Sequence, residues 1–155
     1  MATFIRGGFV ALFLLTGMVP PALAAEADIL GRWTTHKGGQ IEIAPCDDGS
    51  RQICGFIARL AHDDHDTPPL DTQNPEPALR DRPLLGLKLF FDFDYDGDDR
   101  WKGGRIYNVE NGKTYKSKLR LLSQDQLKLS GCVFIFCSSY TWNRTPPAQE
   151  ETIDQ

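Results

Sequence analysis

Acidic side chains that could bind a metal ion are concentrated between Asp92 and Asp98. The segment Asp92-Phe-Asp94-Tyr-Asp96-Gly97-Asp98 alternates carboxylates and contains a glycine suited to a turn, as in the first half of a calcium loop. The twelfth position of such a loop is Gly103, whereas a calcium loop needs a bidentate glutamate there. No flanking helix is indicated. We therefore expect a solvated hairpin turn, with a calcium site as the alternative.

A second cluster of potential metal ligands is His62-Asp63-Asp64-His65-Asp66. Imidazole and carboxylate groups in a loop could capture a cation. No regular element is predicted around them to hold their geometry. We expect a hydrated loop and no metal site.

The sequence offers little support for catalysis. It has no G-x-S-x-G nucleophile motif, and Ser138-Ser139 has no assigned base. The carboxylates lie in predicted loops, where nothing raises their pKa for acid–base chemistry. We predict a protein that is not an enzyme and carries no cofactor.

The elements that must position any binding site are predicted to be β-strands, and the clearest signal is the hairpin from Trp101 to Leu121. Asn111-Gly112 joins two alternating runs, and this pair favours a tight turn because both positions adopt positive φ. A two-residue loop pairs Ile106 with Ser117, and a four-residue loop shifts the partners by two without changing the faces. The predicted inner face carries Gly104, Ile106, Asn108, Tyr115, Ser117, Leu119 and Leu121. The predicted solvent face carries Arg105, Tyr107, Lys116, Lys118 and Arg120.

The inner face of this hairpin is rich in small and polar residues. We interpret it as the lining of a cavity, while the alternative is that small residues make room for large side chains opposite. Further strands are expected at Gly31–His36, Gln40–Pro45, Gln52–Leu60, Leu85–Phe93, Gln126–Val133 and Ser139–Arg144. In the fourth of these, Leu85, Leu87, Leu89, Phe91 and Phe93 are expected to share one face.

About eight strands with mostly short connections predict an all-β fold, an antiparallel up-and-down β-barrel. An immunoglobulin-like sandwich is the alternative. In a closed barrel the first and last strands adjoin, so Arg144 can lie across the indole of Trp33. We assign Trp33, Arg144 and Trp101 structural roles.

The four cysteines are Cys46, Cys54, Cys132 and Cys137. An even number in an exported chain predicts disulfides, and we expect Cys46–Cys54 and Cys132–Cys137 because each pair flanks a predicted turn. A zinc site is the alternative, although the spacings are unlike paired C-x-x-C motifs.

The N-terminus resembles a targeting segment. Arg6 precedes an apolar run from Phe9 to Val19, and Ala22-Leu23-Ala24 fits a cleavage site. The run is shorter than the roughly 20 residues that a membrane span needs. We predict a signal peptide at residues 1–24, one barrel domain at 25–145, a flexible tail at 146–155, and a periplasmic or secreted location. The formal net charge of −4 argues against a phosphate-binding surface and therefore against nucleic acid.

The one long connection, from Ala61 to Leu84, is rich in Pro and Asp and also contains His and Asn. Loops of this length in compact domains are usually functional or disordered. Leu70 and Leu79 could hold it down as a lid over one end of the barrel.

Several short motifs, taken in order, resemble a bacterial exported family called domain of unknown function 2147. They are Gly31-x-Trp33, Cys54-Gly55, Asn74-Pro75, Arg80-Asp-Arg82-Pro83-Leu84-x-Gly86-Leu87, Trp101-x-Gly103-Gly104-x-Ile106-Tyr107, Asn111-Gly112-Lys113-Thr114-Tyr115 and Trp142-x-Arg144. The resemblance covers nearly all of the chain after the signal peptide and implies a lipocalin-like barrel without an established biochemical role. One departure is Glu76 after Asn74-Pro75, where the family usually has Asp.

A lipocalin-like barrel predicts that a small apolar or amphipathic ligand binds inside. Asn108, Tyr115 and Ser117 would orient it from the inner face, and Asp71, Asn74, Arg80 and Arg82 would organise the lid loop. The alternative for the loop is self-bracing, with its arginines bonding Asp71 and loop carbonyls. The alternative function is a protein-interaction module or inhibitor of the cell envelope that acts through its rim loops.

Overall fold

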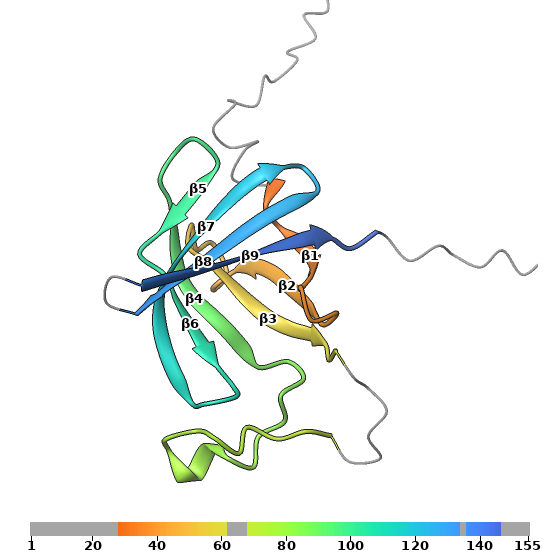
Figure 1. Ribbon diagram of the computed structural model, residues 1–155, viewed down its shortest axis with the longest axis vertical. Coiled ribbons are helices and arrows are strands. Elements are labelled where there is room, and N and C mark those ends of the chain that lie inside the picture. Colours follow the sequence, from red (N-terminus) through yellow and green to blue (C-terminus); the bar gives the residue numbers. More distant parts are fainter. Residues whose placement is uncertain (1–27, 62–67, 134–135, 147–155) are drawn as a thin grey trace, which may run out of the picture.

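The computed structural model describes residues 28–61, 68–133 and 136–146, without the side chains of residues 132–137 (Figure 1). The predicted signal peptide, the His62–Asp66 cluster and all but the first residue of the predicted tail lie outside these ranges. The strands are β1 Gly31–Thr34, β2 Gln40–Pro45, β3 Ile53–Arg59, β4 Lys88–Tyr95, β5 Arg100–Lys102, β6 Arg105–Asn108, β7 Lys113–Ser123, β8 Gln126–Val133 and β9 Phe136–Arg144. The described residues contain one short 3₁₀-helix, η1, at Pro77–Leu79.

The strands form a closed antiparallel barrel of eight positions (Figure 1). β5 and β6 share one position, because both pair with β4 on one side and with β7 on the other. β9 pairs back onto β1 through Trp33 with Arg144 and Thr34 with Asn143. The predicted all-β, lipocalin-like barrel is confirmed, and the sandwich alternative is excluded by the continuous pairing.

Closure aligns two elements from opposite ends of the chain. The guanidinium of Arg144 lies 4.3 Å from the centre of the Trp33 ring and donates hydrogen bonds to the carbonyls of Leu30 and Gln124. The Trp33 indole is buried and donates to the carbonyl of Ile29 at 2.8 Å. The contact between Arg144 and Trp33 is therefore part of the junction that closes the barrel.

One end of the barrel is packed solid by aromatic side chains. Phe90, Phe93, Trp33 and Trp101 are each at most 1 % exposed, and the Phe90 and Phe93 rings meet edge to face at 5.4 Å. Gly55 and Gly104 make room for them, because a Cβ on Gly55 would overlap the Phe90 ring and one on Gly104 the Phe93 ring. These two glycines support the interpretation in which small residues accommodate large ones opposite.

The predicted alternation from Leu85 to Phe93 is wrong. Phe90 and Phe93 are fully buried, Phe91 is half-buried, and Leu85 is 54 % exposed. Asp92 adopts a positive φ of 62°, and the pairing of β4 with β3 shifts in register along the same stretch. Such a bulge changes which residues face inward, so strict alternation from one end of the strand cannot hold.

The β6–β7 hairpin has the four-residue connection, because Ile106 pairs with Tyr115 and Asn108 with Lys113. The predicted faces are observed with one correction. Tyr107 lies on the outer face of β6 but is only 5 % exposed, because a loop distant in sequence covers it. An alternating pattern defines the two faces of a strand but not what packs against the outer one.

The predicted Cys46–Cys54 disulfide is confirmed. It links the end of β2 to β3 and adds on the order of 2–3 kcal/mol in the chain-entropy model. Cys132 and Cys137 are direct partners in the β8–β9 pairing, while their side chains lie outside the described part, so this second disulfide stays a prediction.

Replacing Gly55 by alanine should destabilise the barrel because the new methyl group overlaps the Phe90 ring. We expect the free energy of unfolding to fall by about 1–3 kcal/mol, measured by urea denaturation. Gly131→Ala is the matched control, since its Cβ would lie 3.6 Å from Ser117 Oγ in ordinary contact. Equal losses in the two variants would show that close packing around Gly55 is not the cause.

Candidate ligand-binding cavity

The end of the barrel opposite the packed aromatics contains a cavity of about 520 Å³. Its wall is mostly apolar and includes Ile41, Ile57, Leu89, Ile106, Leu129 and Trp142. These residues come from β2, β3, β4, β6, β8 and β9, so the cavity exists only because the sheet closes. Sites of this volume and character commonly hold a small ligand.

The mouth of the cavity is formed by the β1–β2 turn, the chain after β3 and the β6–β7 turn. Lys37 and Glu110 form an ion pair between two of these segments. The His36 and Tyr140 rings stack at 4.1 Å, and Arg59 donates to the carbonyl of Gly38 at 3.0 Å. The mouth of the cavity therefore carries charged side chains, whereas the wall farther inside is mostly apolar.

The prediction from sequence missed His36, Lys37, Arg59 and Glu110. Lys37 and Glu110 are 73 residues apart, and no local pattern connects their turns. The hydrogen bond from Lys37 and its charge hold the pKa of Glu110 below its ordinary value. Both side chains are more than half exposed, so this pair adds little to stability.

Two of the three predicted inner polar residues line the cavity. Asn108 and Tyr115 do so, although each is also engaged in the β6–β7 turn: Asn108 Oδ1 accepts from the Glu110 amide, and the Tyr115 hydroxyl accepts from Asn111 Nδ2. Ser117 is buried, donates to the carbonyl of Tyr115 at 3.3 Å and is not part of the lining.

Trp142 lines the cavity and also carries a buried polar atom. Its side chain is 3 % exposed, and its indole Nε1 has no hydrogen-bond acceptor among the described residues. A buried donor left unpaired costs about 1–3 kcal/mol. Sequence patterning predicted Trp142 only as part of a family motif and not as a cavity residue.

The four predicted loop residues form one hydrogen-bonded group around a buried carboxylate. Asp71 is fully buried and accepts from the Tyr107 hydroxyl at 2.6 Å, from Asn74 Nδ2 at 2.8 Å and from Arg82 Nε at 2.9 Å. Arg80 Nε donates to the Asn74 carbonyl at 2.8 Å. The loop arginines thus bond Asp71 and a loop carbonyl, as the self-bracing alternative describes.

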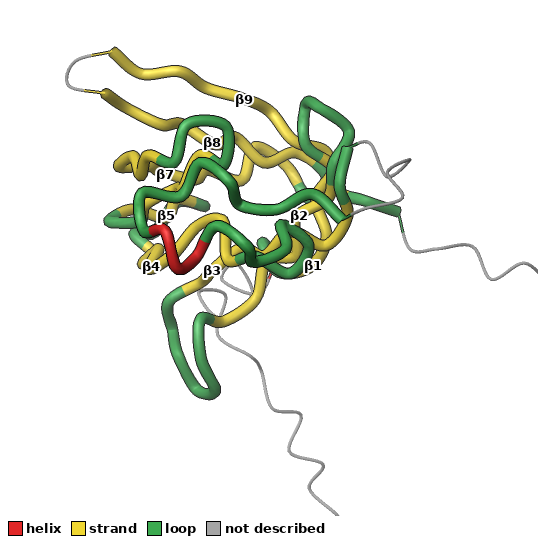
Figure 2. The backbone as a smooth tube through the Cα atoms, turned by 90° about the horizontal axis from the view of Figure 1, so that it is seen from below, coloured by secondary structure: helices red, strands yellow, loops and turns green. Residues whose placement is uncertain are grey.

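This group fixes the loop at the mouth end of the barrel. In Figure 1 the loop lies below β6, and in Figure 2, seen from below, it passes in front of the strands. The loop also presses on the β6–β7 turn, because a Cβ on Gly112 would overlap the carbonyl of Gln73. No described residue of the loop from 68 to 86 lines the cavity, so the ligand-binding role of its four residues stays a prediction.

The pKa of Asp71 is set by opposing effects. Burial disfavours the charged form, but hydrogen bonds from Tyr107, Asn74 and Arg82, with the charge of Arg82, hold the pKa below its ordinary value of 3.8. Burial and the neighbouring Asp71 raise the pKa of Tyr107, which stays a donor. Asp71 therefore contributes stability above its ordinary pKa, and this is lost as the pH falls through its folded pKa.

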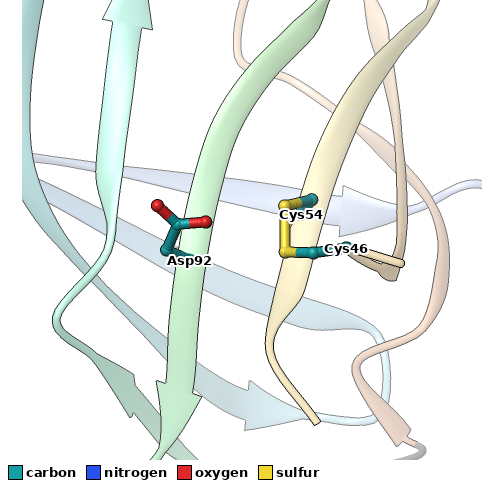
Figure 3. A group of neighbouring side chains, drawn as sticks. All are labelled: Cys46, Cys54 and Asp92. Carbon is teal, nitrogen blue, oxygen red and sulfur yellow. A yellow bond between two sulfur atoms is a disulfide. The ribbon is translucent and has the colours of Figure 1, made fainter. Parts of the chain in front are cut away.

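Figure 3 shows the group of possible metal ligands found among the described residues, Cys46, Cys54 and Asp92. Their ligand atoms lie within 4.8 Å of one another, but the two sulfurs are bonded to each other and provide no thiolate. The carboxylates of the calcium-like segment engage separate partners. Asp92 contacts Arg105, Asp94 accepts from Gln52, Asp96 pairs with Lys102, and Asp98 pairs with Arg100.

Comparisons with known proteins identify the family and the fold. A family model described as "Uncharacterized protein conserved in bacteria (DUF2147)" matches residues 31–144. No curated protein matches the chain. A solved structure titled "Protein HP1028 from the human pathogen Helicobacter pylori belongs to the lipocalin family" is 23 % identical, with a TM-score of 0.66 over 76 % of this chain and 82 % of that one. Within the described residues, no helix is long and apolar enough for a membrane crossing.

Replacing Tyr107 by phenylalanine should destabilise the protein by about 1.5–3 kcal/mol at neutral pH, because Asp71 loses a hydrogen bond to its charged form. The loss should shrink as the pH falls and Asp71 becomes protonated. Urea denaturation at several pH values measures both effects.

Tyr115→Phe is the matched control, since the Tyr115 hydroxyl takes part in an exposed hydrogen bond with Asn111. We expect it to cost no more than about 0.5 kcal/mol, with no dependence on pH. A loss in Tyr107→Phe that stayed constant down to acid pH would contradict the assigned role of the Asp71 carboxylate.

Proposed function

The chain belongs to DUF2147, a family of uncharacterised proteins conserved in bacteria, and with its lipocalin-like barrel as the premise we propose that it binds a small apolar or amphipathic molecule inside the barrel. The observation that carries the proposal is the mostly apolar cavity of about 520 Å³. Apolar walls stabilise a ligand by removing its apolar surface from water, and a few polar groups orient it.

The arrangement of polar groups favours an amphipathic ligand. The charged side chains of Lys37, Arg59 and Glu110 lie at the mouth, while the deeper wall is aliphatic and aromatic. Asn108 and Tyr115 also line the cavity, and the buried indole N–H of Trp142, another lining residue, has no acceptor among the described residues. A ligand with a polar head at the mouth and an apolar body inside matches this order.

The proposed role is binding and not catalysis. The Lys37–Glu110 ion pair and the stacked His36 and Tyr140 rings engage polar lining residues with one another, and among the described residues the aliphatic and aromatic part of the lining carries no paired acid and base. An interaction module that acts through its rim loops is the less favoured function. It was to be distinguished by a barrel with a solid interior, whereas this barrel contains a cavity.

We propose a periplasmic or secreted location. The Cys46–Cys54 disulfide fits an oxidising compartment, and the predicted signal peptide at 1–24 supplies the route. Native mass spectrometry of the protein purified from its own host would reveal a retained ligand by its added mass.

Filling the cavity should weaken the binding of an apolar fluorescent probe such as N-phenyl-1-naphthylamine. Gly131 lines the cavity, and its Cβ would make only ordinary contact with Ser117, so Gly131→Leu directs a side chain into the space without a backbone clash. We expect the dissociation constant to rise by a factor of about ten or more, measured by fluorescence titration.

The matched control is Ser130→Leu, because Ser130 faces outward and bonds Ser139 on the barrel surface. It should leave the probe affinity within about twofold of the parent. Probe binding that survives Gly131→Leu unchanged would place the probe outside the cavity and would contradict the proposal.

A further inference from the structure

The outer face of β7 carries a row of cations. Lys116, Lys118 and Arg120 are exposed and alternate with the buried Ser117, Leu119 and Leu121. Lys128 on β8 lies directly opposite Arg120 and joins the row. We call Lys116, Lys118, Arg120 and Lys128 the basic face.

The four cations of the basic face form no ion pair with a described carboxylate. The pKa of the nearby Asp96 carboxyl is nevertheless lowered by its hydrogen bond from Lys102 and, in smaller part, by the charge of Lys118. The cations of the adjoining strand position each have a carboxylate: Arg100 pairs with Asp98, Lys102 with Asp96, and Arg105 with Asp92. The net charge of −4 gives no indication of this surface, because it is a sum over the whole chain and does not report local clusters of cations.

The basic face also places like charges directly opposite one another. Arg120 is the partner of Arg100 on β5 and of Lys128 on β8, and Lys116 is the partner of Arg105 on β6. Figure 1 shows β5, β7 and β8 side by side on this wall. Directly opposed like charges oppose folding, so folding alone does not account for this arrangement.

The row ends in an apolar side chain. Leu122 follows Arg120 on the same face of β7 and is 47 % exposed. Cations attract an anionic lipid surface, and an exposed leucine beside them can enter its apolar zone. The outward positions of β7 and the described part of β8 carry no aromatic side chain on which nucleic-acid bases could stack.

We propose that the basic face, with Leu122, docks this protein on an anionic membrane surface. The interaction is peripheral and reversible, because it uses four cations and one apolar side chain. It is independent of the cavity, so a protein that bound no ligand could still dock in this way.

Co-sedimentation with lipid vesicles tests the proposal. The full chain should bind vesicles of equal parts phosphatidylcholine and phosphatidylglycerol, and should not bind phosphatidylcholine alone. Raising the salt from about 0.05 M to about 0.5 M should release it, since the Debye length shrinks severalfold. Binding to both vesicle types alike would overturn the charge-based mechanism.

Charge removal on the basic face gives the decisive comparison. Lys118→Gln with Arg120→Gln should weaken binding by a factor on the order of 20–30, about fivefold per charge. The matched control, Arg32→Gln with Lys88→Gln, removes the same charge from β1 and β4 and should change binding less than about twofold. Equal weakening in the two double variants would overturn the assignment to this face.

Leu122→Ser and a duplex DNA of matched charge separate a membrane from other polyanions. We expect the serine variant to lose vesicle binding severalfold and DNA to bind far more weakly than vesicles. If DNA bound tightly, and bound the parent chain and the Leu122→Ser variant equally well, the basic face would be a general surface for polyanions, and membrane docking would be refuted.

Arg120→Gln alone tests whether the basic face opposes folding. Because it relieves repulsion from Arg100 and Lys128, the urea midpoint should stay the same or rise. A clear drop in the midpoint would show that Arg120 has a structural role and would count against a docking surface.

Discussion

The pairing of β1 with β9 closes the sheet, and every other feature of the protein depends on that closure. β1 has only four residues, and its described pairing with β9 consists of two residue pairs. Arg144 strengthens this short junction by lying over Trp33 and by bonding the carbonyls of Leu30 and Gln124. The cation–π contact contributes roughly 0.5–2 kcal/mol. Without closure, β1 and β9 would expose unpaired backbone groups, and the inner face would be open to water.

Closure produces an interior that is packed at one end and open at the other. Aromatic rings fill the first end because Gly55 and Gly104 provide the space that Phe90 and Phe93 occupy. At the other end the inner residues include aliphatic and small ones, such as Ile57 and Gly131, beside aromatic ones such as Trp142, and a cavity of about 520 Å³ remains. The packed end gives the barrel its stability, and the open end is the part that can take a ligand.

Charge serves different purposes at the buried contact between the long loop and the barrel and on the exposed surface of β7. Asp71 is a buried carboxylate whose hydrogen bonds with Tyr107, Asn74 and Arg82 attach the long loop to β6. Such a group stabilises only when all its partners are present. The basic face shows the opposite arrangement, since Arg120 lies between Arg100 and Lys128 and forms no ion pair with a described carboxylate. The buried Asp71 group stabilises the fold, whereas the cations of the basic face are available to attract an anionic partner.

The sequence by itself determined most strand positions, the presence of a turn at Asn111-Gly112, the all-β class and the Cys46–Cys54 link, because each follows from local alternation, turn residues or short spacing. The predicted conformation of that turn was wrong, because only Gly112 and not Asn111 has a positive φ. Part of the cavity was also foreseen, through Asn108 and Tyr115 on the inner face of the hairpin. Only the tertiary structure decided the phase of β4, where the bulge at Asp92 brings Phe90 and Phe93 inward together. It also decided the burial of Tyr107 under Asp71 and the Lys37–Glu110 pair at the mouth. These contacts join residues that are far apart in the chain. They form only when the sheet closes, so no local sequence pattern predicts them.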